Sequence, residues 1–306
     1  MKFSVWITPA HNFRKTFCMR KMHFCFLLLC PLFVFAQRME LPMSGSFDYH
    51  SGYSFEYSRT YKQSKWVAYQ LIGNDALQMT LPEVQFYNDP KLPAGALDMS
   101  DFSQRVYPPG QMKPSGDARA DKVEMHDAFY FANICPMQPT FDQENWRILE
   151  NMVRGWAMIF DTIYVVSGPA FKKNPDTIGP HKIPVPDYFY KVLLVNNGID
   201  MQAIGFVLPN IDVRYDFRSK AVSVDSVERL TGIDFFYQLP DYLEVSLEAE
   251  VLPSFWTGGS NSHYIKQMVR PKEKQCVGAT IIDKRCLSMT SCLNVCCAIH
   301  GCEGEK

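Results

Sequence analysis

The sequence lacks an excess of basic residues, because 31 lysines and arginines stand against 32 aspartates and glutamates. The first 36 residues hold five basic residues and no acidic ones, so their removal leaves 26 against 32, a net charge of about −6. Such a chain has no overall positive field with which to attract a polyanion. Any binding of phosphate groups must therefore come from a local site.

The sequence also lacks internal repeats at any period of about 20 to 50 residues, which argues against a solenoid or a propeller. It has no long linker between residues 46 and 250. Hydrophobic residues make up 47% of the chain and aromatic residues 14%, which is enough to bury a full core. We therefore expect one large domain with short appendages.

A hydrophobic run long enough to span a bilayer is missing from the N-terminal region. Residues 24–35 are apolar, but a membrane-spanning helix needs about 20 such residues. The run follows the basic stretch 19–23, and its end, with Ala36, forms the sequence Val34-Phe35-Ala36. This pattern is typical of a signal peptide cleaved before Gln37. We predict that residues 1–36 are a signal peptide, that the mature protein is exported to the periplasm or the extracellular space, and that it has no stable membrane insertion.

Two alternatives concern the same segment. The conventional start of the signal could be Met19 or Met22, which would make residues 1–18 an overextended start. Leu27-Leu28-Leu29-Cys30 could instead be a lipidation site, although only about six apolar residues precede the cysteine. Export is common to both alternatives.

Cysteines are scarce in the body of the chain and crowded at its end. Six of the ten lie in the last 31 residues, within a predicted tail of residues 251–306. In an exported protein this density favours disulfides, with 15 pairings open to six cysteines. A zinc site using His300 with Cys297 and Cys302 is an alternative, but the tail has no C-x-x-C pair; an unstructured tail is another. We expect Cys135, in the body, to be a buried free thiol.

Strand-like and helix-like patterns alternate between residues 46 and 250, which predicts one α/β or α+β domain. Apolar residues at three- and four-residue spacing predict a helix from Asp142 to Phe160, with Asp142 as a candidate N-cap. A second helix is predicted over Val224–Leu230. The predicted strands are Lys65–Ile72, Ala128–Ile134, Thr162–Val166, Tyr188–Val195 and Gln202–Leu208.

Three motifs in order along the chain resemble a known family. Residues 106–117, Val-Tyr-Pro-Pro-Gly-Gln-Met-Lys-Pro-Ser-Gly-Asp, follow the frame of a Tyr-Asp-Arg-Gly-His signature. Residues 129–136, Phe-Tyr-Phe-Ala-Asn-Ile-Cys-Pro, are similar to its F-Y-x-x-N-x-x-P segment, and residues 146–150, Trp-Arg-Ile-Leu-Glu, to its W-x-x-L-E helix. Residues 46–250 thus resemble the DNA/RNA non-specific endonucleases, the beta-beta-alpha-metal or His-Me finger nucleases that include endonuclease G.

This resemblance implies a central, mostly antiparallel sheet flanked by helices, with a metal site where a loop meets the long helix. In such enzymes a histidine takes a proton from water, and a single Mg²⁺ (or Mn²⁺) stabilises the charge that develops on phosphorus. The contacts go to phosphate, so DNA and RNA are both partners and base identity is not read. A protein inhibitor is a further class of partner to test.

The resemblance places Gln111 at the position of the catalytic histidine. An amide can orient a water molecule but cannot deprotonate it, and a general base contributes about 10²- to 10⁴-fold to the rate. Pro108 and Pro109 replace the acidic and basic residues that precede the histidine, which removes an arginine from the site. We expect catalysis to be slowed.

The metal and phosphate positions fall on the long helix. The metal-binding asparagine corresponds to Asp142, whose carboxylate is a better Mg²⁺ ligand than an amide, unless Asp142 only caps the helix. Glu150 matches the glutamate that holds metal-bound waters, and Arg154 matches an arginine that touches phosphate. Their i, i+4 spacing puts both on one helix face, where a plain salt bridge is the alternative. Asn133 is expected to have a structural hydrogen-bonding role.

Three further residues could replace functions that the site has lost. His126 and His181 are the histidines that could replace the missing base, although a lone histidine is more often structural. Lys113 could attract phosphate, with a solvent-facing side chain as the default expectation.

Three functions follow from these features. The first is an exported, Mg²⁺-dependent endonuclease with little sequence preference. The second is a catalytically inactive protein of the same fold that binds nucleic acid or an extracellular protein; the acidic mature charge favours a protein. The third is a disulfide-stapled surface protein whose working part is the cysteine tail.

Overall fold

The computed structural model describes residues 38–75, 85–104, 106–198 and 200–256. The predicted signal peptide and the six C-terminal cysteines lie outside these residues, so both remain predictions. Among the described residues, no helix has the length and apolar character needed to cross a membrane.

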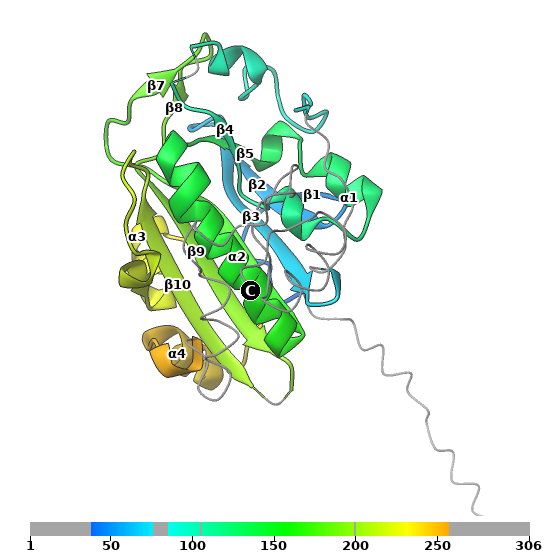
Figure 1. Ribbon diagram of the computed structural model, residues 1–306, viewed down its shortest axis with the longest axis vertical. Helices are drawn as coiled ribbons and strands as arrows, with labels where there is room; N and C mark the ends of the chain where they lie inside the picture. Colours follow the sequence, from blue (N-terminus) through cyan, green and yellow to red (C-terminus); the bar gives the residue numbers. More distant parts are fainter. Residues whose placement is uncertain (1–37, 76–84, 105, 199, 257–306) are drawn as a thin grey trace, which may run out of the picture. The chain divides into compact units, whose positions relative to one another are not determined.

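A seven-stranded sheet, antiparallel throughout, forms the centre of the domain (Figure 1). The mostly antiparallel sheet expected from the sequence is therefore confirmed. In spatial order its strands are β1 (Asp48–His50), β2 (Tyr53–Ser58), β3 (Gln63–Ile72), β6 (Thr162–Ala170), β9 (Tyr188–Asn196), β10 (Met201–Pro209) and β11 (Ala221–Val222).

The longest strands show why four of the five strand predictions are confirmed. Strands β3, β6, β9 and β10 run through the centre of the sheet and are buried on both faces, so their sequences are nearly continuous apolar runs. Short edge strands such as β1 and β11 carry no such signal and were not predicted.

The fifth strand prediction, Ala128–Ile134, is wrong. Residues 131–133 form a 3-10 turn, and only Ile134–Pro136 (β5) is extended, paired with Pro109–Gln111 (β4). The aromatic residues of this segment are buried from an irregular backbone, which Asn133 holds through its side chain. The Asn133 amide donates to Lys113 O and Ala128 O, both at 2.8 Å, and accepts from Lys113 N at 2.7 Å. The structural role expected of Asn133 is confirmed.

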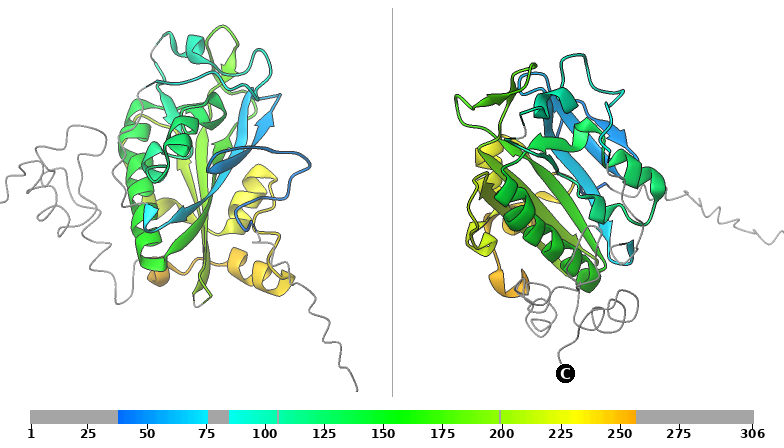
Figure 2. Two further views of the ribbon diagram at one scale, coloured as in Figure 1. Left: turned by 90° about the vertical axis from the view of Figure 1, so that its right-hand side faces the viewer. Right: turned by 45° about the horizontal axis from the view of Figure 1, so that its top comes forward.

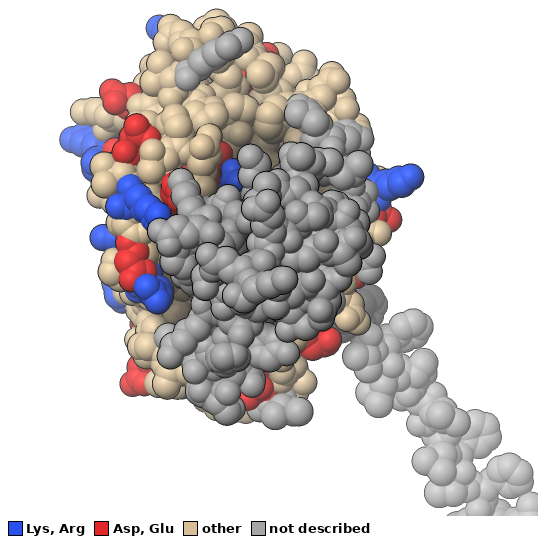
Figure 3. Space-filling view, in the orientation of Figure 1, with Lys and Arg blue, Asp and Glu red and all other residues tan. Residues whose placement is uncertain are grey.

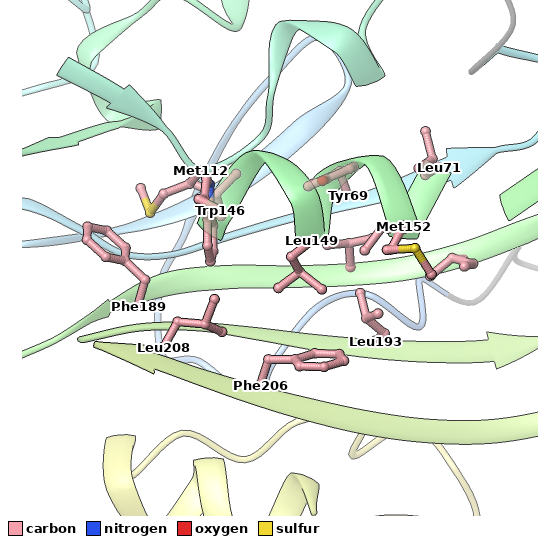
Figure 4. Close-up of a cluster of buried hydrophobic side chains, with 14 of the residues drawn as sticks. Tyr69, Leu71, Met112, Trp146, Leu149, Met152, Phe189, Leu193, Phe206 and Leu208 are labelled. Atoms are coloured by element: carbon pink, nitrogen blue, oxygen red, sulfur yellow. The ribbon is translucent and has the colours of Figure 1, made fainter. Parts of the chain in front are cut away.

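Two hydrophobic clusters lie on opposite faces of the sheet because successive strand residues point to opposite sides. Val165 and Leu193 belong to the cluster under helix α2 (Arg147–Phe160), whereas Val166 and Leu194 belong to the cluster under helix α3 (Val224–Thr231). Figure 2 shows α2 on one side of the sheet and α3 on the other. In Figure 4, helix α2 lays its apolar side chains over the strand residues of the first cluster.

The remaining elements connect or cover the sheet. Helix α3 confirms the predicted second helix and ends at Gly232, which takes the left-handed conformation (φ 69°) that favours glycine. The others are η2 (Met99–Phe102), η3 (Ser115–Asp117), α1 (Lys122–Asp127), β7 (Thr177–Ile178), β8 (Ile183–Pro184), η6 (Phe217–Lys220), α4 (Asp241–Ala249) and α5 (Pro253–Trp256).

The start of the long helix corrects one expectation. Asp142 is not an N-cap, because a π-helical segment, η5 (Phe141–Trp146), precedes α2 and Asp142 lies inside it. The backbone N–H of Arg147 donates to Asp142 O, an i to i+5 bond that widens the turn. Single π turns inside α-helices are frequent at functional sites.

Candidate active site

Strand β4 and segment η5 meet at Gln111, the residue in the predicted general-base position. The Trp146 indole donates to Gln111 O at 3.1 Å and fixes the strand against the helix. The side-chain amide is also held at both ends, since Nε2 donates to Ala128 O and Oε1 accepts from Ser115 N, each at 2.9 Å. Gln111 is therefore well oriented and half-buried.

Asp142 lies one wide helical turn ahead of α2. Burial raises the pKa of its carboxyl to about 6, and the nearby charge of Arg147 opposes that rise only in part. No hydrogen bond to this carboxylate comes from any residue in the described parts of the chain. A desolvated carboxylate without donors has a strong need for a positive partner.

Glu150 lies further along the chain on helix α2, and its carboxylate interacts electrostatically with that of Asp142. Its side chain is 9% exposed, and burial raises the pKa of its carboxyl. The charges of Arg154 and Lys191 oppose this rise, while Asp117 and Asp142 add to it. The Glu150 carboxylate likewise accepts no hydrogen bond from the residues described here, so both candidate ligands keep their oxygens free for another partner.

Arg154 is held by a buried ion pair. Its Nη1 lies 2.7 Å from Asp117 Oδ1, its Nη2 donates to Asn151, and the arginine is 3% exposed. The other oxygen of Asp117 accepts from the Tyr69 hydroxyl at 2.8 Å. The guanidinium is thus fixed beside Glu150, with much of its charge already offset by Asp117.

Lys191 on strand β9 supplies a second buried cation that the motif comparison did not identify. Its ammonium donates to Ser167 Oγ at 2.6 Å and to Met112 O at 3.4 Å, and lies 4.3 Å from the centre of the Trp146 ring. Burial lowers the pKa of this lysine, and Glu150 opposes the shift. A signal was present in the sequence, because Lys191 is the single charged residue of an otherwise apolar strand.

The donor set fits a divalent cation. The charges of Arg154 and Lys191 act on Glu150, and that of Arg147 acts on Asp142. Of the three carboxylates, only Asp117 is engaged in a short ion pair, with Arg154. Hard ions such as Mg²⁺ prefer oxygen ligands and are usually held by one or two carboxylates with further waters. Asp142 and Glu150 are the pair that could serve this purpose.

The two histidines that could substitute for the base form their ion pairs and ring contacts with residues other than Gln111. His126 lies 3.3 Å from Asp127 and stacks on Tyr87. His181 lies 3.0 Å from Asp101, beside a short 3-10 helix. Both make the structural contacts expected of lone histidines.

Two further expectations have clear outcomes. Lys113 does not face solvent, since it is 1% exposed, donates to Gly52 O at 2.8 Å and lies 3.2 Å from Glu124. Asn133 binds the backbone of Lys113, which follows strand β4, and holds it inside the fold. Cys135 is a buried free thiol, as predicted, and burial raises its pKa.

Comparisons with known proteins agree with this arrangement. Residues 34–242 match the model of the DNA/RNA non-specific endonuclease family. The chain is 30% identical over 212 residues to Nuclease C1 of Cunninghamella echinulata var. echinulata, covering 63% of this chain and 82% of the relative. It is 29% identical to the mitochondrial Nuclease EXOG of Danio rerio, covering 65% of this chain and 63% of that protein.

A solved structure supports the fold. A chain from the crystal structure of an EndoG/EndoGI complex superposes with a TM-score of 0.63 at 24% identity, covering 67% of this chain and 92% of the other. The antiparallel sheet flanked by helices is thus the fold of a beta-beta-alpha-metal nuclease. The chain belongs to the DNA/RNA non-specific endonuclease family.

Proposed function

We propose that this protein is an exported, metal-dependent endonuclease that hydrolyses phosphodiester bonds of DNA and RNA without sequence preference, at a rate reduced by Gln111. One observation carries the proposal. The carboxylates of Asp142, which is half-buried, and Glu150, which is buried, have no hydrogen-bond donors among the described residues, and the sequence motif aligns both with the metal-site residues of the family. Export rests on the signal-like segment 1–36 alone.

Asp142 and Glu150 would hold a Mg²⁺ or Mn²⁺ ion, which supplies Lewis-acid stabilisation of charge on the phosphate oxygens when bound. Without the ion, the carboxylates of Asp142 and Glu150 oppose the approach of a phosphate group. The burial of Lys191 and Arg154 beside Glu150 keeps their charges in a region of low dielectric, where they act more strongly than on the surface. These side chains favour a phosphate group only once the carboxylates are neutralised.

Gln111 retains one N–H and one lone pair beyond its contacts with Ala128 and Ser115. It can therefore orient an attacking water, whereas proton removal is left to solvent. We expect a rate about 10²- to 10⁴-fold below that of an enzyme with a general base at this position.

A second function, binding without catalysis, is favoured by the same residue. The Gln111 amide uses its nitrogen and its oxygen in hydrogen bonds to the backbone, and Arg154 forms an ion pair with Asp117. These contacts hold the side chains of the site in place without a substrate. Acidic and basic side chains alternate along the left edge of the face in Figure 3, with no broad basic area among the coloured atoms. Such a surface suits a protein partner better than non-specific DNA. The related EndoG binds EndoGI, so we propose a protein inhibitor as that partner.

The test is cleavage of supercoiled plasmid and of RNA by the purified protein, with Mg²⁺, Mn²⁺ or EDTA. Parent protein is compared with Gln111→His and Glu150→Gln, and with Glu244→Gln as a matched control on the opposite face of the sheet. We expect slow, metal-dependent nicking by the parent, and a loss on the order of 10²-fold in Glu150→Gln. Glu244→Gln should cleave at the parental rate, and Gln111→His should cleave faster.

If neither the parent nor Gln111→His cleaves with any metal, while both remain folded by circular dichroism, the enzyme proposal fails. Binding of a protein inhibitor, measured by calorimetry, would then support the second function. Cleavage that persists unchanged in Glu150→Gln would instead show that the metal position is wrong.

A further inference from the structure

A second group of carboxylates lies on the face of the sheet opposite α2. Helices α3 and α4 pack there (Figure 2), and Asp225 and Glu228 of α3 meet Glu248 of α4. One carboxylate oxygen from each of the three residues lies within 4.8 Å of the others. Three like charges at this separation repel one another unless something neutralises them.

Glu248 has no protein partner to explain its position. Its side chain is 4% exposed, and among the described residues its Oε1 atom is buried without a hydrogen-bond partner. Burial of a carboxylate without a donor or a counter-ion is costly, so such groups are normally paired or bound to a metal. The unpartnered oxygen points to a missing positive ligand within the group.

The surroundings offer little compensation. Asp234 and Glu244 also bring negative charge to Glu248. Arg229 lies 4.0 Å from Asp225, but its side chain is 70% exposed, so the pair is a weak surface ion pair. Glu228 uses Oε1 to accept from Phe235 N at 2.8 Å, which orients it and leaves Oε2 free.

We propose that Asp225, Glu228 and Glu248 form a structural site for a hard divalent cation, with Ca²⁺ preferred. All three ligands are carboxylates, with neither histidine nor cysteine among them, which disfavours zinc and copper. Ca²⁺ accepts six to eight oxygens in flexible geometry and takes carboxylates in either one- or two-oxygen mode, whereas Mg²⁺ demands a near-ideal octahedron. The ion would fasten α4 to α3 and has no part in cleavage, because the sheet separates it from Glu150.

The rival explanation is protonation of Glu248. Burial, followed by the charges of Glu228 and Glu244, raises the pKa of this carboxyl to about 9, so without a cation it is neutral at pH 7. The two explanations differ in their response to Ca²⁺. A protonated glutamic acid gives no stabilisation by Ca²⁺, whereas a cation site links stability to the Ca²⁺ concentration.

The experiment measures thermal unfolding of the full chain in EDTA and in Ca²⁺, with Mg²⁺ as a comparison. Every protein carries Glu150→Gln, so that a cation at the candidate active site does not contribute. Glu248→Gln is compared with Glu244→Gln, which removes the same charge from the same helix but from outside the three-residue group. Asp225→Asn is a second ligand variant, in case Glu248→Gln folds poorly.

We expect Ca²⁺ at about 100 times its dissociation constant to raise the melting temperature by about 5–10 °C in the Glu150→Gln protein and in its Glu244→Gln derivative. The shift should be lost in the Glu248→Gln and Asp225→Asn derivatives. In EDTA the order reverses, and Glu248→Gln melts at or above the temperature of its parent because the cost of keeping Glu248 buried, either charged or protonated, is gone. Calorimetric titration should show one Ca²⁺ bound, and none in Glu248→Gln.

Two results would overturn the proposal. A Ca²⁺ shift of equal size in Glu244→Gln and Glu248→Gln, but smaller than in their parent, would show general screening of negative charge. No shift with any cation in the parent would show that Glu248 is simply protonated. Either result leaves the nuclease proposal untouched, because that proposal is tested by cleavage at Glu150.

Discussion

Buried carboxylates lie on both faces of the sheet, but the charged residues around them differ between the two faces. Under α2, Glu150 lies beside Arg154 and Lys191, two cations that are themselves buried. Between α3 and α4, Glu248 is surrounded by other acids, and the nearby arginine is at the surface. On the first face two buried cations oppose part of the effect of burial on Glu150, whereas on the second face no described cation does so for Glu248, which must take up either a proton or a cation.

The difference shows what a fixed buried cation does to a carboxylate cluster. Arg154 and Lys191 come from different elements, a helix and a central strand, and both point into the same layer. They counter the effect of burial on Glu150, so that the site keeps part of its negative charge for a metal. The α3–α4 face has no strand lysine in this role, since the β9 residues beside Lys191, Tyr190 and Val192, are apolar on that side.

The largest effect is expected from removal of Arg154. Arg154→Leu leaves Asp117 buried without its counter-ion, which should lower the free energy of unfolding by about 3–5 kcal/mol. The matched control is Arg229→Leu on the other face, where an exposed pair contributes about 0–1 kcal/mol. Urea unfolding of both variants in EDTA measures the difference. Equal losses in the two variants would show that burial of the cation does not separate the two faces.

A smaller effect is expected where α3 contacts the sheet. A Cβ atom added to Gly205 on β10 would lie 2.6 Å from Val227 Cγ2, so α3 must shift in Gly205→Ala. We expect a loss of about 1–3 kcal/mol in unfolding free energy and weaker Ca²⁺ binding between α3 and α4, because the shift displaces two of the three ligands. Nicking by the α2 face should be unchanged, as measured on supercoiled plasmid. A parallel loss of nicking would mean that the two faces are coupled through β10.

The smallest effect concerns pH and the α2 face alone. A metal binds deprotonated carboxylates. Burial raises the pKa of Glu150 and raises that of Asp142 to about 6, so cation affinity should fall as the pH drops, with Asp142 adding to the fall below about 6. Below that pH we expect a loss of at least about tenfold per pH unit in Mg²⁺ affinity, and a matching loss of nicking at limiting Mg²⁺. Asp142→Asn should bind more weakly at pH 7 and show less pH dependence. Equal Mg²⁺ affinities at pH 5 and pH 7 in the parent would rule out Asp142 as a ligand.

Much of the fold could be predicted because the signals were local. Continuous apolar runs identified β3, β6, β9 and β10, and the spacing of Trp146, Leu149 and Val153 identified α2. The segment Ala128–Ile134 failed because its aromatic residues suggested extended backbone, whereas Asn133 binds that backbone into a turn through contacts with a segment twenty residues away. Of the two roles that the sequence suggested for Asp142, the N-cap is wrong, because a π turn leaves no pattern of apolar residues that differs clearly from an α turn.

The candidate site was predictable in its helix and less so in its surroundings. Glu150 and Arg154 followed from the motif, but the commitment of Arg154 to Asp117 depends on a partner 37 residues earlier in the chain. Lys191 enters the site from β9, and its contacts with Met112 and Ser167 require the sheet to be assembled. No local sequence pattern predicts that these side chains lie close together, because they come from separate elements of the fold.

The sequence by itself determined the family, the apolar strands and the long helix, because each depends on residue types at fixed spacing. Only the tertiary structure decided which charges are balanced. The sheet directs Lys191 towards Glu150, and the packing of α4 against α3 buries Glu248. Burial then sets the cost of each unpaired carboxylate. That cost depends on desolvation and on neighbours distant in sequence, so it exists only once the chain is folded.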